Sequence, residues 1–251
     1  MREKPVTLYL KELEKYRIGH GLSRTCMAAE LGVPENTYRN WYREHKKHAK
    51  PSAHYGKWLR RFLAYKKILS ADKWILGDGP SLLRAIGFTE GQVVVDFGSG
   101  DGDYTVILAR IVGNKGKVYA VDKNRETLGG VMGRGYAKGL QNIEPIFVSA
   151  KQDPPTDIPV RRRSIDAIWF SDVLHDGYFK EDDKKEKLLE SCRSVLRKKG
   201  FIAVHPVHME EKRLKSVIQR IGFRLEREYR RIVMFHGEEF HKASIFKYRK
   251  A

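Results

Sequence analysis

Apolar positions between residues 93 and 112 change their spacing in the middle of the segment. Three β-branched residues, 93–95, run into Asp96 and a glycine-rich turn, and residues 104–112 then carry apolar side chains at helical spacing. A short continuous apolar run is typical of a strand that is buried on both faces of a parallel sheet. The pattern therefore predicts a buried strand, a tight turn and a helix, in that order.

The same alternation of apolar runs and helical spacing continues to the C-terminus. It predicts helices at 81–86, 125–140, 184–196 and 212–221, and strands at 117–121, 144–149, 165–170, 201–204, 223–235 and 243–248. Turns are expected at 77–80, at 198–200 and around Gly237, where glycine interrupts the pattern. Strands that alternate with helices are typical of a doubly wound α/β fold with a mainly parallel sheet.

The front of the chain has the pattern of short helices only. A helix is expected at 7–16, and Ser23 is placed to cap a second helix that ends at Leu31. Gly32 ends that helix and Pro34 suits the first turn of the next, so the segment predicts a helix-turn-helix. A further basic helix is expected at 58–69. The side chains expected to form the shared core are Met27, Ala28, Leu31, Val33, Tyr38 and Trp41. We therefore predict an all-α domain at 1–75 and an α/β domain at 76–251.

The glycine-rich turn and the acid after the next strand are the candidate ligand site. Glycines let the backbone bend sharply against a ligand, and the helix that follows adds unpaired N–H groups. Asp122 lies 20 residues beyond Gly102, where nucleotide-binding folds place a carboxylate on ribose hydroxyls. The turn is not G-x-G-x-x-G, and Asp96 would repel a pyrophosphate. S-adenosylmethionine, which has a ribose, a cationic amine and a sulfonium but no phosphate, fits better.

These two segments, VVVDFGSGDG at 93–102 and VYAVDKN at 118–124, resemble motif I and the acidic partner of class I S-adenosylmethionine-dependent methyltransferases. The resemblance extends from about Gly87 to the C-terminus. It implies a seven-stranded Rossmann-like sheet that closes with an antiparallel hairpin, and S-adenosyl-L-methionine as the cofactor. The cofactor-binding residues that it implies are Asp96, Gly98, Ser99, Gly100, Asp122, Lys123 and Ser171. A doubly wound domain that binds another nucleotide, or none, is the alternative.

The segment after the predicted strand 165–170 bears on the acceptor. It reads SDVLHD at 171–176 and resembles the small-molecule branch of the family, found in ubiquinone and menaquinone biosynthesis. His175 is a candidate base near neutral pH, or a polar wall of the acceptor site. The run 153–156 resembles the D-P-P-Y motif of amino-group DNA methyltransferases, but it follows the third strand instead of the fourth, so we do not assign it. The histidines lack a tight ligand spacing, and no metal is expected.

Charge distinguishes the front of the chain from the rest. The formal net charge is +18, and residues 39–67 contain ten basic residues and one acid. Such a segment favours nucleic acid or another polyanion, although a merely highly charged protein is the alternative. Residues 22–41 also resemble the helix-turn-helix of the lambda repressor/Cro type. The resemblance implies contacts to DNA or RNA bases by Asn36, Arg39 and Asn40 and to phosphates by Arg43, Lys46 and Lys47; a helical cap over the cleft, or a protein-docking module, is the alternative.

The remaining composition narrows the setting. Two cysteines, Cys26 and Cys192, form no disulfide framework and no metal pattern, which fits a reducing cytoplasm. No signal peptide and no membrane span are expected. We predict a cytoplasmic methyltransferase that acts on a small molecule or a nucleic acid. The alternative is a DNA-binding regulator whose α/β domain senses S-adenosylmethionine without turnover.

Overall fold

The computed structural model describes residues 6–19, 23–31, 33–43, 59, 73–148, 155–235 and 239–250. The chain separates into two compact units, residues 1–71 and residues 72–251. Each unit is built from its own elements, and each is described separately. The functional division into a helix-turn-helix domain and a methyltransferase domain at residue 75 stays a prediction.

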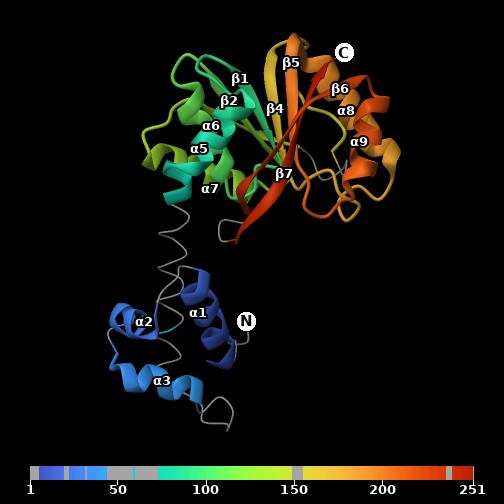
Figure 1. Cartoon of the computed structure of the whole chain (residues 1–251). Helices are drawn as coiled ribbons and strands as arrows, with labels where there is room; N and C mark the ends of the chain where they lie inside the picture. The colour runs from blue at the N-terminus through green and yellow to red at the C-terminus, as the bar shows by residue number, and fades with distance from the viewer. Residues whose placement is uncertain are drawn as a thin grey trace. The chain divides into compact units, whose positions relative to one another are not determined.

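The front unit contains three short helices, α1 (Val6–Gly19), α2 (Arg24–Leu31) and α3 (Glu35–Arg43) (Figure 1). The Ser23 hydroxyl accepts a hydrogen bond from the backbone N–H of Cys26 at 3.0 Å, as expected of an N-cap. The Tyr38 hydroxyl donates to Glu14 at 3.1 Å and so ties α3 to α1. Five of the six predicted core side chains are buried and Val33 is partly buried. Gly32, Lys46, Lys47 and most of the expected helix 58–69 lie outside the described residues.

The second unit is a seven-stranded sheet in the order β3-β2-β1-β4-β5-β7-β6. The pairs among β1 to β5 are parallel, and β7 pairs antiparallel with both β5 and β6. This confirms the predicted doubly wound sheet and its closing hairpin; the tip of the hairpin around Gly237 lies outside the described residues. The strands are β1 (Val93–Phe97), β2 (Lys117–Asp122), β3 (Ile143–Phe147), β4 (Ile165–Ser171), β5 (Leu196–His205), β6 (Phe223–Phe235) and β7 (Glu239–Lys250).

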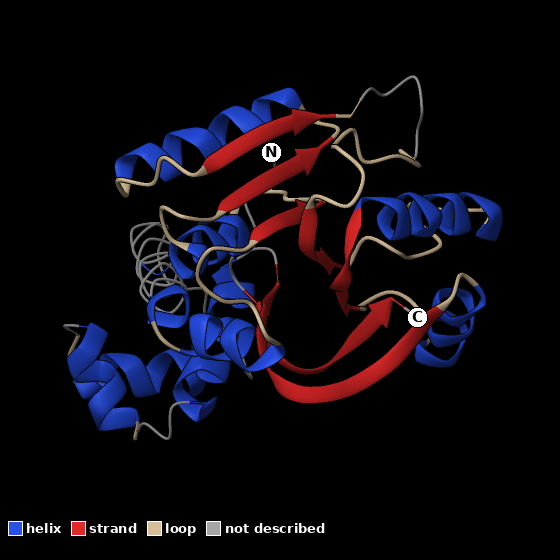
Figure 2. Cartoon of the chain, turned by 90° about the horizontal axis from the view of Figure 1, so that it is seen from above, coloured by secondary structure: helices blue, strands red, loops and turns tan. Residues whose placement is uncertain are grey.

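Five helices cover the two faces of this sheet (Figures 1 and 2). On one side lie α5 (Asp78–Ile86), α6 (Asp103–Val112) and α7 (Arg125–Ala137); on the other lie α8 (Asp182–Val195) and α9 (Glu211–Arg220). The continuous apolar runs of β1 and β4 are buried because helices cover both faces of these strands. No helix among the described residues is both long and apolar enough to cross a lipid bilayer.

Two predicted turns are wrong. Of residues 77–80 only Gly77 is a turn, because α5 begins at Asp78. Gly79 lies inside this helix, at a position where a Cβ would lie 2.7 Å from a ring atom of Trp74. The packing of Trp74 therefore explains why this helical position is a glycine. Residues 198–200 belong to β5, where they form an irregularity instead of a turn. Ile165 pairs with Leu196 and Ala167 pairs with Phe201. An advance of two residues along β4 therefore matches an advance of five residues along β5.

The hairpin of β6 and β7 is much longer than the parallel strands. It curves along its length (Figure 2), and the end of β6 returns to the side of the sheet that carries α5 and α6. There the Tyr104 hydroxyl donates to the Met234 carbonyl at 2.9 Å, and the Trp74 indole N–H donates to the Ile232 carbonyl at 3.4 Å. The hairpin therefore reaches the neighbourhood of the glycine-rich turn that follows β1.

Candidate active site

The glycine-rich turn leaves β1 in a conformation that requires glycine. Gly98 and Gly100 have φ angles of +73° and +48°. A Cβ on Gly98 would lie 2.5 Å from Val173, whereas a Cβ on Gly100 would meet nothing within 4 Å. The N–H groups of Gly98 and Ser99 both donate to the Val121 carbonyl, at 2.8 and 3.0 Å. The turn is therefore fixed to β2, and at Gly100 it borders open space.

Asp122 ends β2 directly beside this turn. One carboxylate oxygen accepts from the N–H of Gly100 at 3.0 Å, and the other accepts from the N–H of Asn124 at 2.9 Å. Each carboxylate oxygen can accept more than one hydrogen bond, so capacity for two ligand hydroxyls remains. The Asn124 side chain in turn caps α7 by accepting from two of its first N–H groups. The carboxylate thus fixes the turn and stays available at its rim.

Asp96 is a buried acid beneath the turn, with 2% of its surface exposed. The Thr105 hydroxyl donates to its carboxylate at 2.5 Å. Burial raises the pKa of Asp96 to about 7, although the Thr105 hydrogen bond acts against this and the Asp122 carboxylate adds to it. Loss of the proton would therefore be favoured by a cation placed above the turn.

The Ser99 hydroxyl is buried in the same turn and has no hydrogen-bond partner among the described residues. A buried hydroxyl without a partner costs free energy, on the order of 1–3 kcal/mol, unless a ligand or water satisfies it. Together with the open space at Gly100, this unsatisfied hydroxyl indicates that a polar ligand belongs against the turn. The side chains that line this position include one hydroxyl and one acid, which suit a zwitterionic amino acid moiety.

A hollow of about 100 Å³ opens over the turn. Ligand pockets usually enclose about 300–1,000 Å³, so this hollow accommodates only one end of a nucleoside and the rest must extend along the sheet edge. Asp122 lies in that direction. The lining residues named from the sequence are Asp96, Gly98, Ser99, Gly100 and Ser171; those that were not are Asp101, Gly102, Asp103, Tyr104 and Met234.

Ser171 and Asp172 follow at the carboxyl end of β4. The Ser171 hydroxyl lies 3.1 Å from Nδ1 of the buried His205, which joins β4 to β5. Asp172 has a φ of +53°, which is uncommon for a residue other than glycine. Its carboxylate accepts from the N–H groups of Val207 and His208 and lies 2.6 Å from Nδ1 of His208. These contacts hold the loop after β5 against the end of β4.

His175 lies in a cluster of polar rings at this same edge of the sheet. Its ring centroid is 5.7 Å from that of His208 and 6.3 Å from that of Tyr178. The Lys123 ammonium lies 4.5 Å from the centroid of the Tyr178 ring. The structure therefore brings Lys123 and His175, which are far apart in the sequence, close to the same tyrosine.

The loop that carries His175 is fixed by a buried lysine. Lys185 has 1% of its surface exposed, and its ammonium contacts Asp176 at 2.5 Å and Asp182 at 3.0 Å. The Arg213 guanidinium contacts both acids as well. Hydrogen bonds from these cations lower the pKa of Asp176 and of Asp182. The loop is thus held in one conformation beside the cluster of rings.

The front unit places its predicted nucleic-acid residues on α3. Asn36, Arg39 and Asn40 are exposed, and Arg39 pairs with Glu35 one turn earlier at 2.5 Å. The side chain of Arg43 lies outside what the structure describes, as do Lys46 and Lys47. Arg39 is thus exposed and in contact with the Glu35 carboxylate on the same helix.

Sequence reasoning missed several residues of this edge for identifiable reasons. Met234 reaches the hollow only through the bend of the hairpin, which no local pattern encodes, and it meets Tyr104 there, at the start of α6. Asp172 stands directly after a strand and before an apolar pair, so its position at a strand end was visible, but its role as an acceptor for the loop after β5 was not. No cluster of three or more metal-ligating side chains occurs within the described ranges.

Comparisons with known proteins show what this part of the chain resembles. Residues 94–200 match the sequence family described as "Methyltransferase domain". The chain is 30% identical over 115 residues to a demethylmenaquinone methyltransferase of Geobacillus stearothermophilus, covering 46% of each chain. It is 32% identical over 121 residues to a ubiquinone/menaquinone biosynthesis C-methyltransferase of Escherichia fergusonii, covering 47% of this chain and 43% of that protein. The chain therefore spans less than half the length of these two curated relatives.

A solved structure extends the likeness over more of the chain. The crystal structure of an S-adenosylmethionine-dependent methyltransferase from Aquifex aeolicus superposes with a TM-score of 0.56 at 23% identity, covering 74% of this chain and 98% of that one. At this identity the likeness concerns the fold. The match of residues 94–200 and the shared fold both agree with the glycine turn described above. Residues 94–200 thus match a methyltransferase domain, and the unit that contains them has the fold of an S-adenosylmethionine-dependent methyltransferase.

Proposed function

We propose that the whole protein is an S-adenosylmethionine-dependent methyltransferase whose reaction takes place at the carboxyl edge of β1, β2 and β4. One observation carries the proposal. The turn after β1 combines a buried acid, a buried hydroxyl without a partner and a glycine that borders open space, all lining one hollow. This donor set suits the amino acid end of the cofactor, and Asp122 stands where its ribose would extend.

The residues predicted from the sequence contact different parts of this cofactor. Asp96 and Ser99 face the methionine end, with Gly98 and Gly100 keeping the backbone free of side chains. Asp122 receives the ribose hydroxyls. When bound, S-adenosylmethionine supplies an electrophilic methyl group on a sulfonium. Ser171, fixed by His205, borders the space between the cofactor and the acceptor.

The remaining site residues serve the acceptor. Lys123 lies against Tyr178, which His175 also approaches, and these side chains form a wall of rings beside the end of β4. A small aromatic acceptor would lie against such rings. His175 is the residue able to take the proton that the acceptor loses as its nucleophilic atom is methylated. The curated relatives, named for menaquinone and ubiquinone biosynthesis, support a small-molecule acceptor over a macromolecule.

Titration calorimetry tests the cofactor step before any acceptor is known. Purified protein should bind S-adenosylmethionine and its demethylated product, S-adenosylhomocysteine, at one site per chain. Formation of S-adenosylhomocysteine with a panel of hydroquinones and other phenols then tests the acceptor class. Absence of heat with both nucleosides would refute the proposal outright. Binding without turnover on any acceptor would instead support the alternative, a regulator that senses the cofactor, which the enzyme relatives do not favour.

We propose a second function for the front unit, because α3 has one buried side and one exposed polar side. Tyr38 and Trp41 are buried against α1 and α2, while Asn36, Arg39 and Asn40 are exposed along the opposite side. We propose that α2 and α3 are a helix-turn-helix that contacts nucleic acid through these three residues. In the full chain, Asn36→Ala with Asn40→Ala should weaken binding to duplex DNA or RNA, whereas Thr25→Ala on the exposed side of α2 should not. Equal affinities would contradict it.

A further inference from the structure

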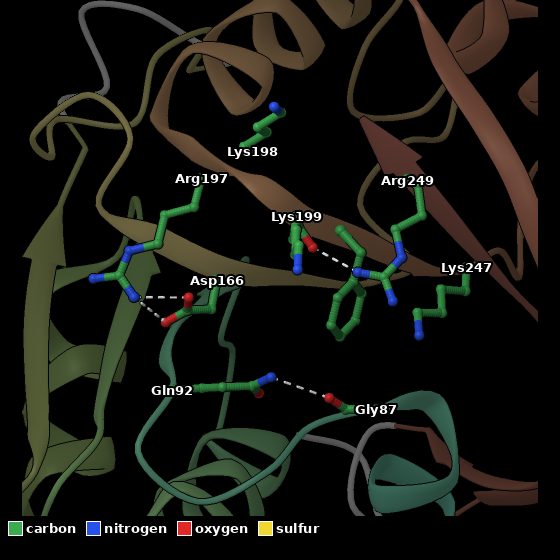
Figure 3. Close-up of a pocket in the computed structure, with 9 residues that line it drawn as sticks. Gly87, Gln92, Asp166, Arg197, Lys198, Lys199, Lys247 and Arg249 are labelled. Carbon is green, nitrogen blue, oxygen red and sulfur yellow. Dashed lines mark hydrogen bonds and ion pairs between the residues drawn. The ribbon is translucent and has the colours of Figure 1, made fainter. Parts of the chain in front are cut away.

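A basic hollow of about 550 Å³ lies at the edge of the sheet opposite the glycine turn. It is bordered by the residues at the amino ends of β1, β4 and β5 and by the last residues of the antiparallel strand β7 (Figure 3). Five of its nine lining residues are cations and one is an acid. The cations are Arg197, Lys198, Lys199, Lys247 and Arg249.

Acids neutralise only part of this charge. Arg197 contacts both carboxylate oxygens of Asp166, at 2.7 and 2.8 Å (Figure 3). Lys247 lies 3.3 Å from Glu226, which also binds Arg249. Neither Lys198 nor Lys199 pairs with an acid within the described part of the chain. Five cations therefore face two acids around one hollow.

The irregularity in β5 creates this concentration of charge. The extra residues of β5 carry the run Arg197, Lys198, Lys199 out of register with β4, so three consecutive cations lie at one place on the sheet edge. Lys247 approaches them from β7, with 7% of its side chain exposed and its ammonium 4.5 Å from the Phe201 ring centroid. Burial lowers the pKa of Lys247, as expected for a cation held away from water without a sufficient counter-charge.

A second basic hollow, of about 630 Å³, lies close by. Arg162, Arg163, Arg193, Arg220 and Lys250 line it, with Glu190 as its acid. The Lys250 ammonium donates to the Arg193 carbonyl at 2.7 Å and to the Leu196 carbonyl at 3.4 Å, so this second hollow borders the start of β5, as the first hollow does. Burial lowers the pKa of Lys250, and the neighbouring arginines Arg193, Arg163 and Arg162 lower it further.

We propose that this surface binds the phosphate backbone of a nucleic acid. We name it the basic edge and define it by six exposed side chains: Arg162, Arg163, Arg193, Arg197, Lys198 and Lys199. Mutual repulsion among cations disfavours such a surface in the free protein, and a line of phosphates would relieve it. Two basic hollows that both border the start of β5 suit a strand whose charges repeat every few ångströms, whereas one bound anion would leave most of the cations uncompensated.

An anionic membrane fits this surface less well. A membrane presents a flat layer of charge, which would meet the rim and leave the hollows unfilled. Peripheral membrane binding also draws on exposed apolar side chains. The apolar side chains that line these two hollows are Phe201, which is 3% exposed and covered by cations, and the partly buried Ile221. Vesicle binding is therefore an outcome that would refute the proposal.

The inference does not depend on the proposed reaction. The five residues of β1 span about 16 Å at roughly 3.3 Å per residue, so the basic edge lies at the other end of the strand from the glycine turn. A nucleic acid held there leaves the cofactor hollow open. The basic edge also contains none of the three residues proposed to contact nucleic acid in the front unit, Asn36, Arg39 and Asn40. Calorimetry with S-adenosylmethionine therefore reports on the reaction site, and the experiment below reports on the basic edge.

Fluorescence anisotropy of a dye-labelled, mixed-sequence single-stranded RNA tests the proposal on the full chain. The variant Arg162→Gln/Lys198→Gln/Lys199→Gln removes three exposed charges without touching a buried group. The control variant Lys138→Gln/Lys180→Gln/Lys212→Gln removes three exposed lysines from the end of α7, the loop before α8 and the first turn of α9. Both variants lower the net charge equally, so a difference between them reports on position. Circular dichroism melting checks that both remain folded.

We expect wild-type affinity to fall steeply with salt, and the basic-edge variant to show a shallower dependence. At about 0.7 log units per phosphate contact on a single strand, three lost contacts reduce the slope of log K against log salt by about 2. The control variant should keep most of the wild-type slope. Equal slopes for both variants, no RNA binding by the wild type at low salt, or binding to anionic vesicles in preference to RNA would each overturn the proposal.

Discussion

Substitution of Gly100 by alanine separates the backbone role of the glycine turn from its role against a ligand. Gly100 has a φ of +48°, and a Cβ there would contact no protein atom within 4 Å. The left-handed conformation costs an alanine roughly 1–2 kcal/mol. Alanine also reduces the conformational entropy of the unfolded chain, which offsets about 0.4–1 kcal/mol of this cost. The net loss of folding free energy is therefore about 1 kcal/mol, or about 2–4 °C in Tm for a chain of this size.

Gly139 provides a matched control, because its φ is +71° and a Cβ there would also meet nothing within 4 Å. Gly139 lies just beyond the end of α7, away from the hollow over the turn. Gly139→Ala should thus cost a similar amount of stability and leave cofactor affinity unchanged. In Gly100→Ala, the methyl group occupies the space proposed for the cofactor.

Calorimetry with S-adenosylhomocysteine and thermal melting measure the two effects on the same samples. We expect both variants to melt a few degrees lower and Gly100→Ala alone to lose at least about tenfold in affinity, equivalent to about 1.4 kcal/mol. If Gly100→Ala bound the nucleoside as tightly as Gly139→Ala does, the cofactor would not lie against this turn. The assignment of Gly98, Ser99 and Gly100 would then fail together.

Three further predictions concern the acids and the hairpin. Asp122→Ala removes the carboxylate that accepts two backbone hydrogen bonds, and it should weaken cofactor binding in the same calorimetry at least about tenfold. The control Asn124→Ala removes the cap of α7, so it should lower Tm but change cofactor affinity little. The pKa of Asp96 is about 7 in the fold and about 4 in an unfolded chain, so the protonated acid stabilises the fold fully below pH 4, and this stabilisation is lost as pH rises towards 7. The difference in Tm between Asp96→Asn and wild type should therefore grow, in favour of the variant, between pH 4 and pH 7. A difference in Tm that stays constant over this range would refute the raised pKa. Tyr104→Phe breaks the hydrogen bond to the Met234 carbonyl and should cost about 1 kcal/mol in denaturant unfolding, while an unchanged midpoint would show that the hairpin is held by other contacts.

The parallel strands could be predicted from the sequence because burial on both faces leaves a local mark. Residues 93–95 and 167–170 are continuous apolar runs, and short runs of this kind are typical of strands that are buried on both faces. The ligand-facing turn was equally visible, since Gly98 and Gly100 adopt backbone angles that favour glycine. Each of these signals lies within about ten consecutive residues.

The features that escaped prediction depend on distance along the chain. The contact of Tyr104 with Met234 joins residues 130 positions apart, and it follows from the bend of a long hairpin. Residues 198–200 have the composition of a turn, but pairing with β4 on one side of the interruption and again at Phe201 keeps them within β5. Gly79 in α5 has the composition of a turn as well, yet the adjacent Trp74 ring requires a residue without a Cβ inside the helix.

Charge shows most clearly why composition alone misplaces a binding surface. The longest basic stretch of the sequence is 39–67, which draws attention to the front unit. In the α/β unit the cations are divided among residues 162–163, 193–199 and 247–250, and acids lie between these segments in the sequence, so no window of the chain looks unusual. The sheet order places β4 next to β5 and β5 next to β7, and all three segments therefore meet at one edge. In a parallel sheet the amino ends of the strands lie together at one edge, just as the carboxyl ends lie together at the other. Its amino edge can thus concentrate charge in the way that its carboxyl edge concentrates the polar groups of the cofactor site.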